Sequence, residues 1–274
     1  MKIEKKKITI ADISELKKSF HSHGLNTVCQ SAKCPNIGEC FKKRTATFLI
    51  LGKNCTRGCR FCGIGKQNPE LVDGNEPKRV AAAVKNLDLS YSVITSVTRD
   101  DLPDSGAKHF AETIKEIRAF NPEIKIEVLV PDFKGEKSSI DIVLSAKPDV
   151  FSHNLETVPS LYAKVRSGAD YKRSLDVLKH AKTKGFKVKT GIMLGLGETE
   201  KEIFEVIDDI RQTGADILTI GQYLAPTKDH YTVIKEYSED EFIKIRDFAV
   251  SSGIKNVVSG RYVRSSYLAN ELDI

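Results

Sequence analysis

Short runs of β-branched and apolar residues alternate with amphipathic helical patterns along most of the chain. Six runs that are apolar along most of their length predict buried parallel strands, at residues 47–51, 92–97, 124–130, 149–155, 187–194 and 216–224. Residues 109–120 carry apolar side chains at helical spacing. The sequences TEKE (199–202) and SEDE (238–241) predict capping boxes, which begin helices at Thr199 and Ser238.

The alternation of strands and helices predicts an α/β protein. The intervals between strands suit crossover helices, and six such units predict a partial (β/α)6 barrel of the TIM type. An open doubly wound sheet is the alternative, but no G-x-G-x-x-G follows the first strand. We expect one integrated domain with an N-terminal extension (1–46), the barrel (47–250) and a C-terminal segment (251–274).

Composition and charge are ordinary for a soluble globular protein, with 274 residues, 40% hydrophobic and 29% charged. No apolar run is long enough to span a bilayer, and the basic start MKIEKKKITI lacks the apolar stretch of a signal peptide, so a cytoplasmic protein without membrane contact is expected. The net charge of +6 is scattered along the sequence. This pattern favours a solvated surface over nucleic-acid binding.

All the cysteines lie between residues 29 and 62, in two groups of three. Disulfides need pairs and are rare in cytosolic chains, while a structural zinc site needs a fourth ligand at similar spacing. His21 and His23 could serve as that ligand, but both lie in a segment (12–23) that is predicted to be helical with the histidines on its surface.

The second group, Cys55, Cys59 and Cys62, forms a C-x3-C-x2-C pattern directly after the first predicted strand. Active sites of β/α barrels lie on the loops that leave the carboxyl ends of the strands. Several glycines in this loop give the backbone the freedom to wrap around a bulky group. Three thiolates without a fourth protein ligand suit a [4Fe–4S] cluster with one open iron.

This C-x3-C-x-φ-C pattern after a barrel strand resembles the radical S-adenosylmethionine superfamily. The resemblance implies that Cys55, Cys59 and Cys62 hold the cluster and that S-adenosylmethionine completes it. It places Phe61 against the adenine. Electron transfer from the cluster would then cleave the cofactor and release a 5′-deoxyadenosyl radical.

The first group, Cys29, Cys34 and Cys40, forms C-x4-C-x5-C before that strand. Together with SVTRDDLPDSGAKHF (96–110), GIMLGLGET (191–199) and VRSSY (263–267), it closely resembles the lipoyl synthase family. The resemblance covers nearly the whole chain. It implies a second, auxiliary [4Fe–4S] cluster whose labile fourth ligand is Ser266, with Ser265 as the alternative.

The same resemblance implies the reaction and the partners. Two sulfur atoms would be inserted at C6 and C8 of a protein-bound octanoyl-lysine, with the auxiliary cluster as a sacrificial sulfur donor and two S-adenosylmethionine molecules used per product. The partners would be octanoylated lipoyl carrier proteins (E2 domains of 2-oxoacid dehydrogenases and the glycine cleavage H protein), an electron donor such as flavodoxin or ferredoxin, and an iron–sulfur carrier. The family suggests a monomer.

Further cofactor contacts follow from the resemblance. Met193 lies in the stretch that is similar to the adenine-binding segment of the superfamily, and Asn154, Glu156 and Arg173 would bind ribose or the methionine carboxylate. Arg99, in TRDD, stands where the superfamily binds the amino group of the cofactor, although its usual G-G-E is absent. A structural interpretation of these polar residues as strand caps or ion pairs stays open.

Two other classes remain as alternatives. Another sulfur-inserting radical enzyme would place the ligands of its extra cluster elsewhere. A non-catalytic iron–sulfur or zinc protein would need four protein ligands for each centre and no large barrel. The motif ends in RSSYLAN, with Leu268 where many relatives have histidine, and this departure leaves Ser266 in place.

Overall fold

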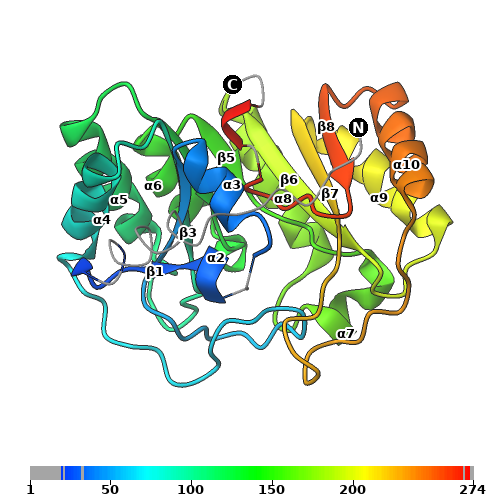
Figure 1. Ribbon diagram of the computed structural model, residues 1–274, viewed down its shortest axis with the longest axis horizontal. Helices are drawn as coiled ribbons and strands as arrows, with labels where there is room; N and C mark the ends of the chain where they lie inside the picture. The colour runs from blue at the N-terminus through cyan, green and yellow to red at the C-terminus, as the bar shows by residue number, and fades with distance from the viewer. Residues whose placement is uncertain (1–19, 21, 32–33, 268, 272–274) are drawn as a thin grey trace.

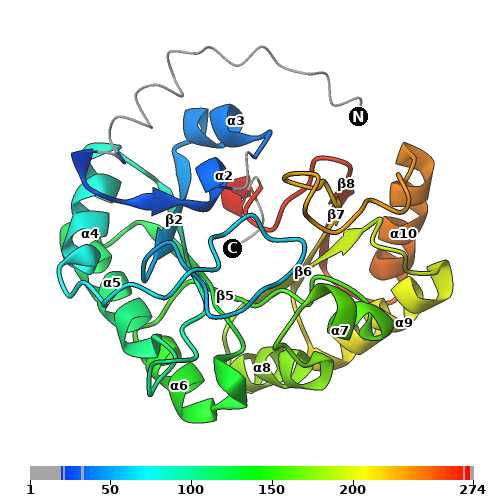
Figure 2. The same ribbon diagram turned by 90° about the horizontal axis from the view of Figure 1, so that it is seen from below.

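The sheet curves into an incomplete barrel (Figure 2). The computed structural model describes residues 20, 22–31, 34–267 and 269–271. Within them the strands pair in the order of the chain, from β1 to β8, with β1 antiparallel and β2 to β8 parallel. Their bounds are β1 Asn26–Thr27, β2 Thr45–Ile50, β3 Tyr91–Ser96, β4 Lys125–Leu129, β5 Val150–Ser152, β6 Val188–Leu194, β7 Ile217–Gln222 and β8 Asn256–Gly260.

Helices between the strands cover the outer face of the curved sheet (Figures 1 and 2). The longer ones are α4 Glu76–Asn86, α5 Ala107–Phe120, α6 Lys137–Ser145, α8 Tyr171–Thr183, α9 Glu200–Thr213 and α10 Glu239–Ser251. The chain also has shorter helices that do not belong to this outer layer as a set, α2 Val28–Ser31, α3 Ile37–Lys42 and α7 Tyr162–Val165, and 3-10 turns at Phe133–Gly135, Pro159–Leu161 and Ala269–Glu271. Because the strands are covered on both faces, most of their residues are buried, as their apolar runs predict.

The predicted helix starts are confirmed at atomic detail. The side chains of Thr199 and Ser238 each accept a hydrogen bond from the backbone N–H three residues later. In turn, the carboxylates of Glu202 and Glu241 accept hydrogen bonds from the backbone N–H of the capping residue. Each cap contributes about 1 kcal/mol to the stability of its helix. Both helices therefore begin where the sequence pattern places them.

The structure adds two strands to the six that were predicted. The short β1 pairs with β2, and β8 extends the parallel sheet from β7 with residues of the predicted C-terminal segment. The strand predicted at 149–155 is shorter, because β5 ends at Ser152, which pairs with Leu129, the last residue of the neighbouring β4. Most of the helix predicted at 12–23 lies outside the described residues.

A buried polar network fills the barrel interior below its carboxyl end. The Lys189 ammonium lies 3.0 Å from the Glu127 carboxylate, which also accepts hydrogen bonds from Tyr91 (2.8 Å) and Ser152 (2.9 Å). Glu127 precedes Leu129, a cavity residue, by two positions, so their side chains share the inner face of the sheet. The network closes the barrel interior on the side of the cavity away from the carboxyl ends of the strands. Its two charges are paired, as burial requires.

Helices α2 and α3 and the segment after β8 lie at the open side of the barrel (Figure 2). Ala269 of this segment is fully buried and packs with Tyr91 and Val93 of β3. Residues from both ends of the described chain therefore meet at the opening. No helix in the described ranges is long and apolar enough to cross a membrane.

Candidate active site

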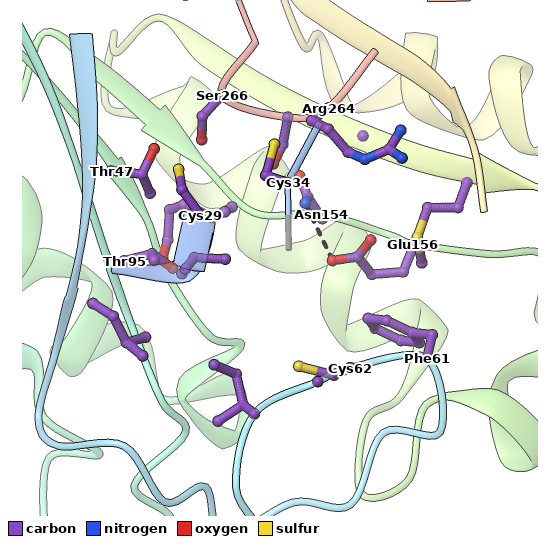
Figure 3. A pocket seen from close by; sticks show the side chains of 18 of the residues that line it. Cys29, Cys34, Thr47, Phe61, Cys62, Thr95, Asn154, Glu156, Arg264 and Ser266 are labelled. Atoms are coloured by element: carbon purple, nitrogen blue, oxygen red, sulfur yellow. Dashed lines mark hydrogen bonds between the residues drawn. The ribbon is translucent and has the colours of Figure 1, made fainter. Parts of the chain in front are cut away.

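A cavity of about 560 Å³ occupies the carboxyl end of the barrel. Both cysteine groups line it, together with Phe61, Asn154, Glu156, Met193 and Ser266. In Figure 3, Cys29 and Cys34 lie at one end of the view and Cys62 at the other, with Asn154 and Glu156 between them. The cysteines of both groups, all within the described residues, form no disulfide. The structure thus brings the two groups, which are separate in sequence, to one cavity.

The loop after β2 presents Cys55, Cys59 and Cys62 to this cavity. The Cys55 N–H donates to the Gly65 carbonyl at 2.8 Å, which closes the loop at its base. The Cys55 sulfur accepts hydrogen bonds from the backbone N–H groups of Arg57 (3.4 Å) and Thr98 (3.3 Å). These two contacts fix the position of the Cys55 sulfur at the cavity wall.

Arg57, inside the cysteine motif, fastens the loop to the barrel. Its Nε and Nη2 donate to Asp100 at 2.7 and 2.9 Å, and Nη2 also lies 2.6 Å from Oδ1 of Asp132. Burial alone would raise the pKa of Asp132, but the Arg57 guanidinium lowers it to about 2. The loop is therefore held by ion pairs at the ends of two neighbouring strands, β3 and β4.

Burial affects the protonation of the other two thiols of the loop, Cys59 and Cys62. Burial raises the pKa of Cys59 to about 11 and that of Cys62 to about 12. Both thiols therefore carry their protons at neutral pH, and each must lose its proton when it binds a metal centre.

The N-terminal group is built from α2, the turn after it, and α3. The Cys34 N–H donates to the Cys29 carbonyl at 2.9 Å, which holds these two residues close together. The thiols of these two residues share a hydrogen bond, which raises the pKa of Cys29 and lowers that of Cys34 to about 7. Cys40, on α3, completes the group at the cavity wall.

The segment after β8 reaches the same end of the cavity. Ser265 and Ser266 both line it, at the centre of a turn in which the Tyr267 N–H donates to the Arg264 carbonyl at 2.9 Å. Figure 3 shows the Ser266 hydroxyl on the same side of the cavity as Cys29 and Cys34. The predicted fourth ligand therefore lies in the same region as its cysteines.

Three of the predicted cofactor residues meet between β5 and β6. The Asn154 amide donates to the Glu156 carboxylate at 3.1 Å (dashed in Figure 3), and the Met193 N–H donates to the Glu156 carbonyl at 2.8 Å. Among the described atoms, Oδ1 of Asn154 is buried without a hydrogen-bond partner. Burial also raises the pKa of Glu156. A ligand with hydroxyl or ammonium donors would satisfy both groups, and a nucleoside with an amino acid moiety has such donors.

Two predicted residues do not line the cavity. The Arg99 guanidinium binds Asp101 at 2.8 Å and the Leu51 carbonyl at 3.3 Å. Arg173 binds Asp132 at 3.2 Å, behind the cavity wall. For both residues the structure supports the alternative of an ion pair that positions loops.

Arg166 is a cavity residue that sequence reasoning missed. It is 9% exposed, and its Nη1 donates to the hydroxyls of Tyr162 (2.7 Å) and Ser174 (3.0 Å). Its guanidinium is thus held mainly by neutral groups, and its positive charge acts on Cys59 and Glu156. Position within YAKVRSGADYKRSL gave no reason to prefer Arg166 over Arg173, since only the fold decides which guanidinium faces inward.

Comparison with known proteins defines the class first. The family model described as the Radical SAM superfamily matches residues 49–210. Methylornithine synthase (PylB) has a TM-score of 0.57 at 14% identity, with 95% of this chain and 87% of that chain covered. SuiB of Streptococcus suis bound to its precursor peptide has a TM-score of 0.61 at 15% identity. The match covers 91% of this chain, which spans only 52% of SuiB. These two likenesses concern the fold alone.

The site and fold are those of a radical S-adenosylmethionine enzyme, a class that uses a [4Fe–4S] cluster and S-adenosylmethionine.

Curated relatives narrow the class. Lipoyl synthase of Caldicellulosiruptor saccharolyticus is 55% identical over 94% of this chain and 92% of its own length. Lipoyl synthase of Aquifex aeolicus is 49% identical over 94% of both chains. The chain belongs to the lipoyl synthase family.

Proposed function

We propose that this chain inserts two sulfur atoms, at C6 and C8, into an octanoyl chain carried on a lysine of a lipoyl carrier protein. The observation that carries the proposal is the convergence of both cysteine groups on one cavity of a radical S-adenosylmethionine barrel. An enzyme that only generates radicals needs one such group. The group of Cys29, Cys34 and Cys40, at the opposite end of the same cavity, fits a sulfur source close to the radical.

The donor set fits the groups that this reaction needs. Cys55, Cys59 and Cys62 would hold the radical-generating [4Fe–4S] cluster, whose fourth position belongs to S-adenosylmethionine. When bound, this pair supplies a carbon radical strong enough to take hydrogen from an unactivated C–H bond. The side-chain oxygen Oδ1 of Asn154 and the Glu156 carboxylate would accept hydrogen bonds from the cofactor. Phe61 and Met193 would lie against its adenine.

The auxiliary cluster would be held by Cys29, Cys34, Cys40 and Ser266. An oxygen ligand on iron binds less firmly than a thiolate, which suits a cluster that gives up its sulfur during turnover. Two S-adenosylmethionine molecules would be used per product, because each C–H bond needs its own radical.

The cavity wall supplies the remaining requirements. Apolar side chains such as Leu49, Val97, Leu129 and Ile192 line much of it, which suits an octanoyl chain and excludes water from a reactive radical. Arg166 adds a buried positive charge near Glu156 and Cys59, and it would attract the carboxylate of the cofactor.

The partners belong to the same proposal. They are octanoylated E2 domains or the glycine cleavage H protein as substrate, flavodoxin or ferredoxin as electron donor, and an iron–sulfur carrier that restores the auxiliary cluster. The chain would act as a monomer in the cytoplasm, where free thiols persist.

The test is a mass spectrum of an octanoyl-lysyl peptide after anaerobic incubation with reconstituted protein, S-adenosylmethionine and a strong reductant. We expect a product with two added sulfur atoms, limited to about one per chain because the cluster is consumed. Formation of 5′-deoxyadenosine with an unchanged peptide would retain the radical chemistry and overturn the substrate. Protein with zinc in place of iron would overturn both.

A further inference from the structure

Two side-chain contacts join α3 to the segment after β8, one on each side of Ser266. Asn36 binds Tyr262, and Glu39 binds Tyr267, across 226 and 228 positions of the chain. Both Asn36 and Glu39 lie between Cys34 and Cys40, so the stretch that presents two thiols to the cavity also holds the segment that carries the serine.

The first contact uses an asparagine that caps no helix. Asn36 stands at the N-cap of α3, where its side chain would ordinarily accept a backbone N–H of the first turn, but that bond is absent. Its amide instead donates to the Tyr262 carbonyl at 2.7 Å, and the residue is 7% exposed. Asn36 therefore contributes its side chain to the distant segment and not to its own helix.

The second contact is a phenol–carboxylate hydrogen bond. The Tyr267 hydroxyl donates to Oε2 of Glu39 at 3.1 Å. Burial, together with this carboxylate, raises the pKa of Tyr267 to about 12, so the hydroxyl remains a donor at neutral pH. Tyr267 is the residue directly after Ser266, and its position limits where the serine hydroxyl can reach.

The backbone between the two contacts has little freedom. Ser265 and Ser266 occupy the centre of the turn from Arg264 to Tyr267. Upstream, the Val263 carbonyl packs so closely on β7 that a Cβ at Gly221 would lie 2.1 Å from it. Only glycine at position 221 permits this approach. The turn is thus fixed on one side by the barrel and on the other by α3.

We propose that Asn36 and Glu39 are positioning residues that hold Ser266 at the auxiliary cluster, acting through Tyr262 and Tyr267. This inference rests on the proposed role of Ser266 as a cluster ligand. Neither residue touches the cluster in this assignment. They connect the turn that carries Ser266 to the helix that carries Cys40, so the serine hydroxyl keeps a fixed position relative to the cysteines.

The test uses the full chain with Cys55→Ala, Cys59→Ala and Cys62→Ala, so that only the auxiliary cluster is assembled with ⁵⁷Fe. Mössbauer spectra report the iron that has a distinct ligand, and a chelator reports how fast the first iron is released. We expect Asn36→Ala, Glu39→Ala and Tyr267→Phe to shift the spectrum toward that of Ser266→Ala and to release the first iron about tenfold faster. Tyr267→Phe removes a single hydroxyl and is the variant least able to disturb folding.

Two further variants distinguish the positioning of Ser266 from a general stabilisation of the interface between α3 and the segment after β8. Glu39→Gln keeps a side-chain acceptor for Tyr267 and should give the parent spectrum. Asn270→Ala removes an exposed side-chain hydrogen bond to the Lys43 carbonyl (3.4 Å), on the same interface but away from the serine turn and from Glu39, and should behave as the parent does.

The outcomes separate this inference from the proposed function. If Ser266→Ala matches the parent, serine ligation fails and the positioning role fails with it. If Ser266→Ala differs but Asn36→Ala, Glu39→Ala and Tyr267→Phe match the parent, the ligand stands and the positioning role is overturned. Equal effects in Asn270→Ala and Glu39→Ala would also overturn it.

Discussion

Nη2 of Arg57 lies 2.6 Å from Oδ1 of Asp132, and neither side chain is more than 7% exposed. Asp132 also binds Arg173 at 3.2 Å. This carboxylate therefore connects the cysteine loop after β2 with the start of α8. The geometry of the loop that carries Cys55, Cys59 and Cys62 depends on a buried charge pair in addition to the cysteines themselves.

Arg57→Ala should destabilise the apoprotein by about 3 kcal/mol, because the buried Asp132 carboxylate keeps only the longer contacts with Arg173 (3.2 Å) and with the Lys134 N–H (3.1 Å). Urea unfolding followed by circular dichroism measures the free energy of unfolding. Lys244→Ala, which breaks the exposed pair with Glu200, is the matched control and should cost less than about 1 kcal/mol. Equal losses in the two variants would contradict the structural importance of the buried pair.

The Asp132 carboxylate also predicts acid sensitivity. Its pKa is about 2 in the folded chain against an ordinary value of 3.8, so its contribution is complete only above about pH 5. That contribution, about 2 kcal/mol, is lost progressively as the pH falls from about 5 to about 2, because the unfolded chain binds the proton first. The free-energy difference between the parent and Asp132→Asn should narrow over this range. A difference that stays constant with pH would rule out this assignment.

Ser266→Ala should keep S-adenosylmethionine cleavage and lose sulfur insertion, because only the auxiliary cluster is altered. Chromatography of 5′-deoxyadenosine and mass spectrometry of the octanoyl peptide measure the two activities in one reaction. Ser265→Ala is the control, and it should retain both. Parallel loss of both activities in Ser266→Ala would show that the roles of the two clusters are not separate.

Cys59→Ala should abolish S-adenosylmethionine cleavage, because a cluster with two thiolates does not keep an ordered open iron. Cys40→Ala, in the other group, should cleave the cofactor and fail only at sulfur insertion. Iron analysis and 5′-deoxyadenosine formation follow both variants. If Cys40→Ala loses cofactor cleavage as well, the assignment of the groups to separate clusters is wrong.

Asn154→Ala should weaken S-adenosylmethionine binding about tenfold, because the variant lacks the buried Oδ1 that a donor of the cofactor would satisfy. Equilibrium dialysis with reconstituted protein measures the dissociation constant. Arg99→Lys is the control, since Arg99 points to Asp101 and Leu51 and should leave that constant unchanged. A larger effect at Arg99 than at Asn154 would reverse the two assignments.

Local sequence signals predicted the elements well, since they depend on neighbouring residues. Apolar runs located β2 to β7, and the capping boxes at Thr199 and Ser238 located two helix starts. The strand β8 (NVVSG) was missed because it is short, has two polar or glycine ends and is only half-buried. Its pairing with β7 decides its conformation more than its own composition does.

Residues of the candidate site were predictable where chemistry restricts the residue type. Cysteines at C-x3-C-x2-C spacing have few other uses, and the structure gathers both groups at one cavity. Arginines are less informative, because Arg99 and Arg173 form loop contacts while Arg57 and Arg166 face the cavity. Which side of a loop a guanidinium occupies depends on tertiary packing, and that information is absent from a local motif.

The contacts between Asn36 and Tyr262 and between Glu39 and Tyr267 also have a consequence for biosynthesis. They join residues 226 and 228 positions apart, so they cannot form until the ribosome has delivered the segment after β8. By then the strands that carry and support Cys55, Cys59 and Cys62 have already emerged. Strands β2 to β7 can therefore pair before this segment is available, whereas the contacts on either side of Ser266 form only after residues 262–267 have been translated.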